Sequence, residues 1–172
     1  MINMNCPLIP MLAITGKPDR EWIHERLHGL RQGGIEQFLI YARSGCELEY
    51  LGKDLFDTCE TLIQEAQSMN FSGIWIYDEF NWPSGQCRGK VQSAAPEFAM
   101  QFLDCTQTPS GEWHFNVLSA SDTDYPAEGK RESEAGGSRL GFPNILNSDA
   151  VELFIKLTYD EYAKRFGSLF GT

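Results

Sequence analysis

Positive charge and long apolar runs are what this sequence has least of. Lys and Arg together number 14 against 24 acidic residues, which leaves a net charge of -10 over 172 residues. Nucleic acids and anionic membrane surfaces are bound through clustered basic residues, so the composition argues against both partners. The sequence has no run of 18 apolar residues and no signal-like amino terminus, so we expect a soluble, cytoplasmic protein.

Paired cysteines are also absent. No two cysteines have the C-x-x-C spacing of a zinc knuckle or a thioredoxin-like motif, and their total of five is odd. We therefore expect free thiols in a reducing compartment, with Cys59 in the core, and we expect no cofactor.

Aromatic residues, in contrast, are plentiful, at 12% of the chain. Most of them should lie in the core, but aromatic side chains also stack on flat apolar faces of ligands. The acidic balance is compatible with a neutral ligand such as a sugar, although solubility alone explains it equally well.

The order of the apolar segments predicts an α/β fold. Continuous apolar stretches alternate with amphipathic ones, which is typical of parallel strands joined by helices. The expected strands are 8–14, 38–42 and 73–77, and the expected helices run from about Pro18 to the Gly33-Gly34 pair and from Lys53 to Ser68. Together they predict three βα units over about residues 8–85 of a single domain that spans 1–172.

The pattern changes after Pro83. Alternating apolar residues on both sides of a turn at 108–111 predict a β-hairpin insertion over about 96–120, with one buried face. The polar segment 121–138 predicts a mobile loop. A terminal helix is expected over about 148–168, capped by Ser148-Asp149.

Polar residues follow the predicted strands, where α/β folds bind ligands. The candidate substrate-binding residues are Arg43, Asp78, Asn81 and Trp82, and Glu79 is the first choice for an acid–base role. A structural role for all of them, as an ion pair and a rigid turn, fits the sequence equally well. Adjacent strand residues point to opposite faces, so Asp78 and Glu79 cannot together form the carboxylate pair of a glycosidase.

Three segments of this sequence resemble the large bacterial glycoside hydrolases related to the family 106 α-L-rhamnosidases. Residues 41–51 resemble the second-strand segment of that group, and residues 76–85, with Gly89-Lys90-Val91 behind them, resemble the next one. Residues 157–171 resemble the helix that precedes the fourth strand.

This resemblance implies a partial TIM-type (β/α) barrel with the hairpin as an insertion and a carbohydrate site at the carboxyl ends of its strands. In that group the general-acid carboxylate is expected at the end of the fourth strand and its partner later. We therefore expect this chain to lack a complete catalytic pair and to be inactive alone, with a non-catalytic carbohydrate-binding or assembly module as the alternative. Tyr41 and Tyr159 stand where the group tends to have His, and residues 11–16 lack its usual tryptophans, which removes expected sugar contacts.

Two further expectations complete the sequence analysis. Residues His24, Glu25 and His28 match the H-E-x-x-H pattern of zinc proteases, which makes metal chemistry a distant third hypothesis. An incomplete barrel leaves strand edges unpaired, so we expect either a homodimer through those edges or a fold in which the hairpin covers one of them.

Overall fold

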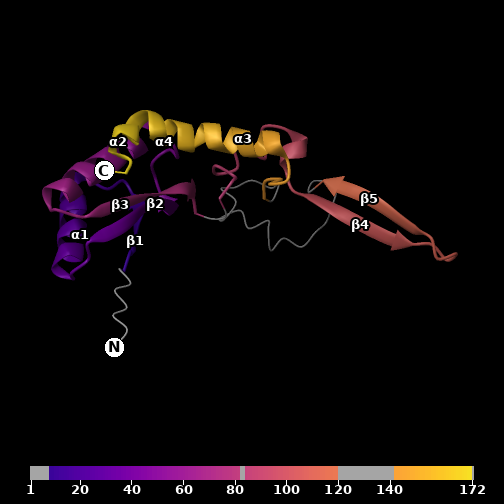
Figure 1. The fold of residues 1–172 in the computed structure, drawn as a ribbon, viewed down its shortest axis with the longest axis horizontal. Coiled ribbons are helices and arrows are strands. Elements are labelled where there is room, and N and C mark those ends of the chain that lie inside the picture. The colour runs from indigo at the N-terminus through magenta and orange to yellow at the C-terminus, as the bar shows by residue number, and fades with distance from the viewer. Residues whose placement is uncertain (1–7, 82–83, 120–141, 172) are drawn as a thin grey trace. The chain divides into compact units, whose positions relative to one another are not determined.

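A computed structural model of the protein describes residues 8–81, 84–119 and 142–171 (Figure 1). The predicted mobile loop at 121–138 and the candidate residue Trp82 lie outside these ranges. The chain divides by its contacts into two units, Met1–Asp78 and Glu79–Thr172, and each is described by itself.

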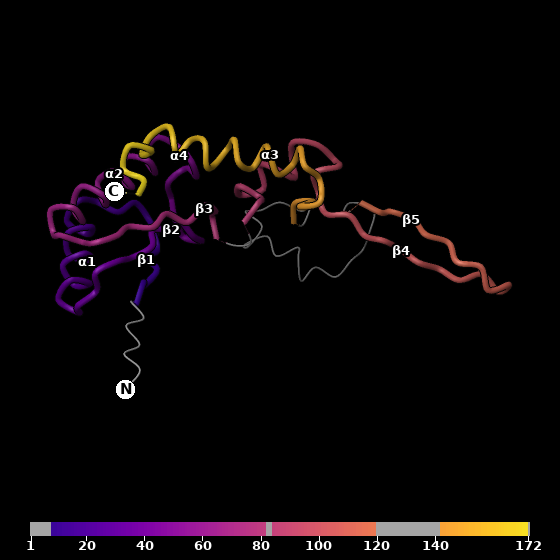
Figure 2. The backbone as a smooth tube through the Cα atoms, viewed as in Figure 1, coloured from indigo at the N-terminus to yellow at the C-terminus, as the bar shows by residue number. Residues whose placement is uncertain are grey.

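The first unit alternates strands and helices, as predicted. Its elements are β1 (Met11–Gly16), α1 (Arg20–Gln32), β2 (Gln37–Cys46), α2 (Lys53–Ser68) and β3 (Gly73–Phe80), whose last two residues belong to the second unit. The strands form a parallel sheet in the order β1-β2-β3, and Figure 2 lets the chain be followed through it. The mixed α/β class is thereby confirmed. The described residues form no closed barrel.

Helix α2 supplies much of the core of this unit. Its predicted apolar stripe is buried in full, as Leu55, Cys59, Leu62, Ile63 and Ala66, and Phe56 is buried beside it. The predicted core position of Cys59 is confirmed, and burial raises the pKa of its thiol to about 12. Helix α1 begins at the N-cap Asp19, whose carboxylate accepts from the amide of Trp22, and lies against α2 through a 2.6 Å contact between His24 and Glu65.

Both faces of strand β2 are apolar from Phe38 to Ala42. Phe38, Ile40 and Ala42 alternate with Leu39 and Tyr41 along β2, so neither face of this strand is polar. Strands that are apolar on both faces are typical of parallel sheets, in which crossover helices cover at least one face.

The second unit contains a two-stranded antiparallel sheet and a group of helices. The sheet is the hairpin of β4 (Gln101–Gln107) and β5 (Trp113–Ser119). The other elements are the 3₁₀ turns η1 (Pro96–Phe98) and η2 (Gly167–Leu169) and the helices α3 (Ser148–Leu157) and α4 (Tyr159–Phe166). No helix in the described ranges is long and apolar enough to cross a membrane.

The hairpin is where we predicted it, but the buried face that we expected for it is wrong. Trp113, Phe115 and Val117 are 54%, 62% and 66% exposed. The alternation of apolar residues determines which side chains share a face of a strand. It does not determine whether another layer covers that face, and the hairpin forms a sheet of its own.

The single terminal helix that we expected is two helices. The break is at Thr158, whose backbone has φ -112° and ψ -76° and whose hydroxyl donates to the carbonyl of Phe154 at 2.7 Å. Threonine hydroxyls that bond back to the preceding turn bend helices. The N-cap of α3 is also one residue earlier than predicted, because the side chain of Asn147 accepts from the amides of Asp149 and Ala150.

Candidate functional site

A β-bulge lies near the end of β2, at the carboxyl edge of the sheet. Ile14 pairs with Ala42 but Gly16 pairs with Cys46, so that three residues of β2, 43–45, stand opposite the single residue Thr15. Gly45 takes a left-handed backbone conformation at φ +94°, which glycine tolerates without strain. The bulge leaves the three residues exposed at the edge where α/β folds bind ligands.

Aromatic rings support the Arg43 side chain on this bulge. Its guanidinium lies 5.9 Å from the centroid of the Tyr41 ring. Tyr41 is buried and meets Tyr77 of β3 edge-on, at 5.9 Å between centroids and an interplanar angle of 89°. The Tyr41 ring, which packs against Tyr77, therefore lies beneath an exposed cation.

Asp78 lies at the end of the neighbouring strand β3. Its backbone carbonyl accepts a hydrogen bond of 3.0 Å from the hydroxyl of the buried Tyr50. Tyr50 thereby ties the segment that follows β2 to the end of β3. The structure thus places Arg43 and Asp78 on adjacent strands of one sheet, at the same edge.

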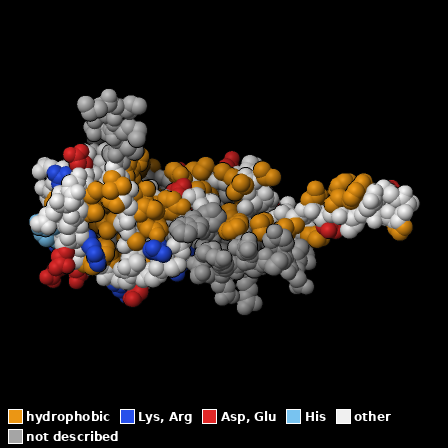
Figure 3. Space-filling view, turned by 90° about the horizontal axis from the view of Figure 1, so that it is seen from below, with side chains coloured by type: hydrophobic (Ala, Val, Ile, Leu, Met, Phe, Trp, Pro, Cys, Tyr) orange, Lys and Arg blue, Asp and Glu red, His pale blue; other side chains and the backbone are white. Residues whose placement is uncertain are grey.

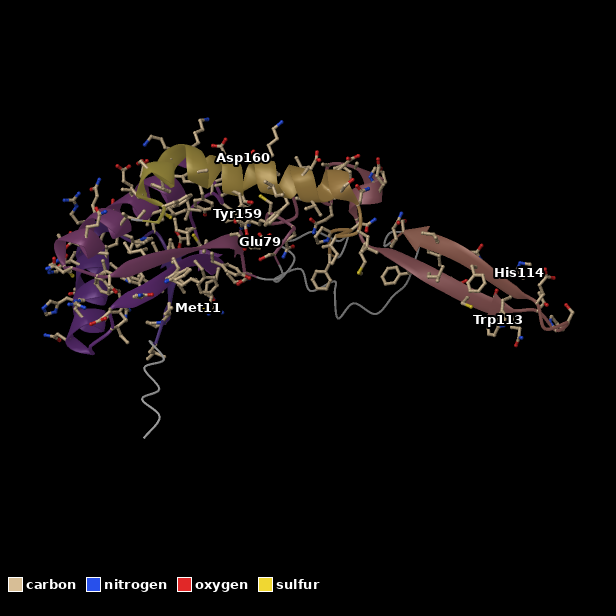
Figure 4. The ribbon with its side chains drawn as sticks, in the orientation of Figure 1. Met11, Glu79, Trp113, His114, Tyr159 and Asp160 are labelled. Carbon is tan, nitrogen blue, oxygen red and sulfur yellow. The ribbon has the colours of Figure 1, made fainter. Side chains whose placement is uncertain are left out.

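Glu79, at the beginning of the second unit and labelled in Figure 4, is fully buried. Backbone amides surround its carboxylate. Oε1 accepts from the N–H groups of Phe80 at 2.7 Å and Arg88 at 2.9 Å. Oε2 accepts from the N–H groups of Gln86 at 2.9 Å and Cys87 at 2.6 Å. Each carboxylate oxygen therefore has two backbone donors.

The loop around Glu79 is built as an anion cradle. Cys87, Arg88 and Gly89 are consecutive residues with positive φ values of 50°, 53° and 85°. Successive amides in such conformations converge on one point and bind anions. Left-handed backbone costs a non-glycine residue about 1–2 kcal/mol, so the carboxylate of Glu79 holds the loop in a conformation that it would not otherwise keep.

Burial and hydrogen bonding act in opposite directions on Glu79. Burial raises the pKa of its carboxyl group to about 7, and the four backbone hydrogen bonds oppose that rise. Such a pKa would suit a general acid, but the carboxylate is enclosed by its own loop. The geometry makes Glu79 an organiser of the backbone at Phe80 and at residues 86–88.

One candidate substrate-binding residue remains among the described ones. Asn81 is buried and has a left-handed backbone with φ 64°, which makes it part of the same loop. The sequence analysis missed the cradle itself. One signal was available in the sequence. Gly85 and Gly89 flank residues 86–88, and Glu79 precedes them just after a predicted strand.

The H-E-x-x-H residues lie on the exposed side of α1. His24 bonds to Glu65 of α2, and its ring stacks on that of His28 at 6.1 Å. Among the described residues, no group of three or more His, Cys, Asp or Glu side chains is arranged to hold a metal ion.

A shallow depression lies on helices α3 and α4. It has a volume of about 450 Å³, and its lining includes the carboxylates of Asp149, Glu152 and Asp160 and the amine of Lys156. Charged residues one turn apart are typical of a solvated helix face.

In comparisons with known proteins, no family model matches this chain, and no curated protein or solved structure matches it either.

Proposed function

We propose that this chain is a sector of a glycoside-hydrolase-like (β/α) barrel that binds carbohydrate and does not hydrolyse it. The observation that carries the proposal is the bulge of residues 43–45, which presents Arg43 above the Tyr41 ring at the carboxyl edge of the sheet. Three arguments support it: the topology, the chemistry of this edge and the state of Glu79.

The topology fits a sector of a barrel. Successive strands of a (β/α) barrel are neighbours, and β1, β2 and β3 stand in that order. The side of the sheet away from Ile40 carries Leu39, Tyr41 and Tyr77, which suits the packed interior of a barrel. Together with the sequence resemblance, this favours a partial barrel over an open doubly wound sheet.

The exposed edge suits a neutral polyol. A guanidinium has five N–H donors, which can donate to the hydroxyl oxygens of a sugar. With a net charge of -10, the protein would repel nucleic acids and other polyanions but not an uncharged sugar.

Hydrolysis would need two carboxyl groups on either side of the glycosidic bond, about 5–5.5 Å apart in retaining enzymes and about 6.5–9.5 Å apart in inverting ones. Glu79 was our first choice for such a role, but both of its oxygens are engaged by backbone amides. Asp78 alone cannot supply both functions. Binding without turnover is therefore the function that this geometry supports best.

Calorimetric titration with a panel of monosaccharides and aryl glycosides, α-L-rhamnosides included, tests the proposal. We expect binding without release of the aryl group and at least a tenfold loss of affinity in Arg43→Ala. Arg26→Ala is the matched control, since Arg26 is an exposed arginine at 5.5 Å from the Trp22 ring on the helix α1. Hydrolysis by the wild type, or equal affinities of the two variants, would contradict the proposal.

A further inference from the structure

One face of the β4–β5 hairpin is apolar and open to solvent. In the antiparallel register, Leu103 stands opposite Val117, Cys105 opposite Phe115, and Gln107 opposite Trp113, and paired residues share a face. We call these six residues the hairpin face. Leu103 is 68% exposed and Phe115 62%, and Figure 3 shows hydrophobic side chains gathered along this part of the chain.

The opposite face of the same hairpin is polar near the turn. Thr106 pairs there with His114, and Asp104 with Asn116. Figure 4 labels Trp113 and His114, neighbours in β5 that lie on opposite faces of the hairpin. The hairpin is thus amphipathic in the manner of one layer of a two-layer sheet. A two-stranded ribbon by itself is only marginally stable in water, so a second layer would stabilise it.

We propose that the hairpin face packs against the hairpin face of a second copy of this chain. The two strands of the hairpin face differ in side-chain size. The two largest side chains, Trp113 and Phe115, lie on β5, and β4 carries the smaller Gln107 and Cys105 opposite them. The third pair, Val117 and Leu103, differs by only one carbon. A two-fold axis parallel to the strands lays β5 of each copy over β4 of the other.

In this arrangement large residues meet smaller ones. Phe115 of one copy lies over Cys105 of the second copy, and Trp113 lies over Gln107. Facing layers of side chains pack well when bulky and small residues alternate in this way, at about 10 Å between the two sheets. The hairpin face is therefore complementary to itself.

The area is sufficient for a dimer. A large aromatic side chain has about 150–250 Å² of surface to bury, and Trp113 and Phe115 are more than half exposed. Together with Leu103, Val117, Cys105 and Gln107, the face offers up to roughly 600 Å² per copy, so two copies bury at most roughly 1,200 Å². That is the lower end of the range for specific protein–protein interfaces.

The chemistry of the face favours a protein surface over a sugar. None of its six residues carries a charge, and Leu103 and Val117 stand beside the aromatic rings where a sugar would need hydrogen-bonding partners. A second copy supplies an uncharged apolar surface of the same size. This contact is distinct from the edges of the parallel sheet.

Sedimentation equilibrium of the full chain in reducing buffer tests the proposal. We expect a concentration-dependent dimer in the wild type. The double variant Phe115→Ser and Val117→Thr should weaken it at least 30-fold. The matched control, His114→Ser with Asn116→Ser, changes the opposite face of the same strand and should dimerise like the wild type.

A second measurement needs no variant that could fail to fold. Cys105 is exposed in the single chain and covered by Phe115 of the second copy in the dimer. Its rate of alkylation in the wild type should fall at least tenfold across the concentration range in which the dimer forms. The proposal would be overturned if the wild-type chain stayed monomeric, if the dimer survived the double variant, or if alkylation did not depend on concentration. Binding of a sugar or a vesicle to this face of a monomer would also overturn it.

Discussion

Replacing Glu79 with glutamine tests whether this residue organises its loop. The substitution keeps the size of the side chain but exchanges one acceptor oxygen for an NH₂ group. Two of the four backbone N–H groups then face a nitrogen that accepts no hydrogen bond, whereas the hydroxyl oxygen of the protonated acid can still accept one. A buried donor without an acceptor costs about 1–3 kcal/mol, so Glu79→Gln should destabilise the closed loop by roughly 2–6 kcal/mol.

The effect should depend on pH in a defined direction. The pKa of Glu79 is raised from 4.5 to about 7 in the folded protein, so the folded state binds this proton more tightly than the open one. The contribution of Glu79 to stability is then complete below about pH 4.5 and is lost as the pH rises through about 7. A rise of this size corresponds to roughly 3 kcal/mol. Because glutamine does not titrate, the difference between variant and wild type should be largest at pH 5 and should shrink toward pH 8.

Hydrogen exchange measures this locally. The amides of Gln86, Cys87 and Arg88 should exchange at least about 30-fold faster in Glu79→Gln at pH 5, after correction for intrinsic rates, since about 1.4 kcal/mol corresponds to a factor of ten. Glu152→Gln, an exposed glutamate on α3, is the control and should leave them unchanged. Unchanged protection in Glu79→Gln, or a difference that grows from pH 5 to pH 8, would refute the reasoning.

Three more predictions follow from the local structure. Asn147→Ala removes the acceptor for two amides at the start of α3 and should lower the free energy of unfolding by about 1 kcal/mol, as measured by urea unfolding. An unchanged free energy of unfolding would contradict the role of Asn147 as the N-cap. Leu62→Ala empties a fully buried position on α2 and should cost about 2–5 kcal/mol in the same assay, whereas a cost below 1 kcal/mol would mean that α2 does not pack as described. Burial raises the pKa of the Cys59 and Cys87 thiols to about 12, so both should resist alkylation in the native dilute protein while Cys105 reacts. Peptide mass spectrometry would show which thiols are labelled, and rapid labelling of Cys59 would contradict its place in the core.

The first unit could be predicted from the sequence because each signal was local. The boundaries of α2 were predicted as Lys53 to Ser68 and are found there, since its apolar stripe repeats over four turns. Strand β2 was predicted too short. Its bulge at residues 43–45 consists of an arginine, a serine and a glycine, and such a polar, glycine-containing segment typically indicates the end of a strand.

The second unit was harder because its main features depend on backbone conformation and on layer packing, which side-chain patterns do not record. The cradle around Glu79 is formed by amides up to nine residues away, and no side-chain pattern marks a backbone that converges on a carboxylate. The exposure of the hairpin face was missed for a similar reason. Alternation reveals two faces, but only the packing of other layers decides which face meets water.

The most direct test of carbohydrate binding is to follow the backbone amide resonances of the labelled chain during titration with the sugars of the panel. The account predicts saturable shifts at residues 43–45 and at Asp78, their loss in Arg43→Ala, and no product in the same tube after the titration. Shifts confined to other parts of the chain, or the appearance of hydrolysed sugar, would contradict it.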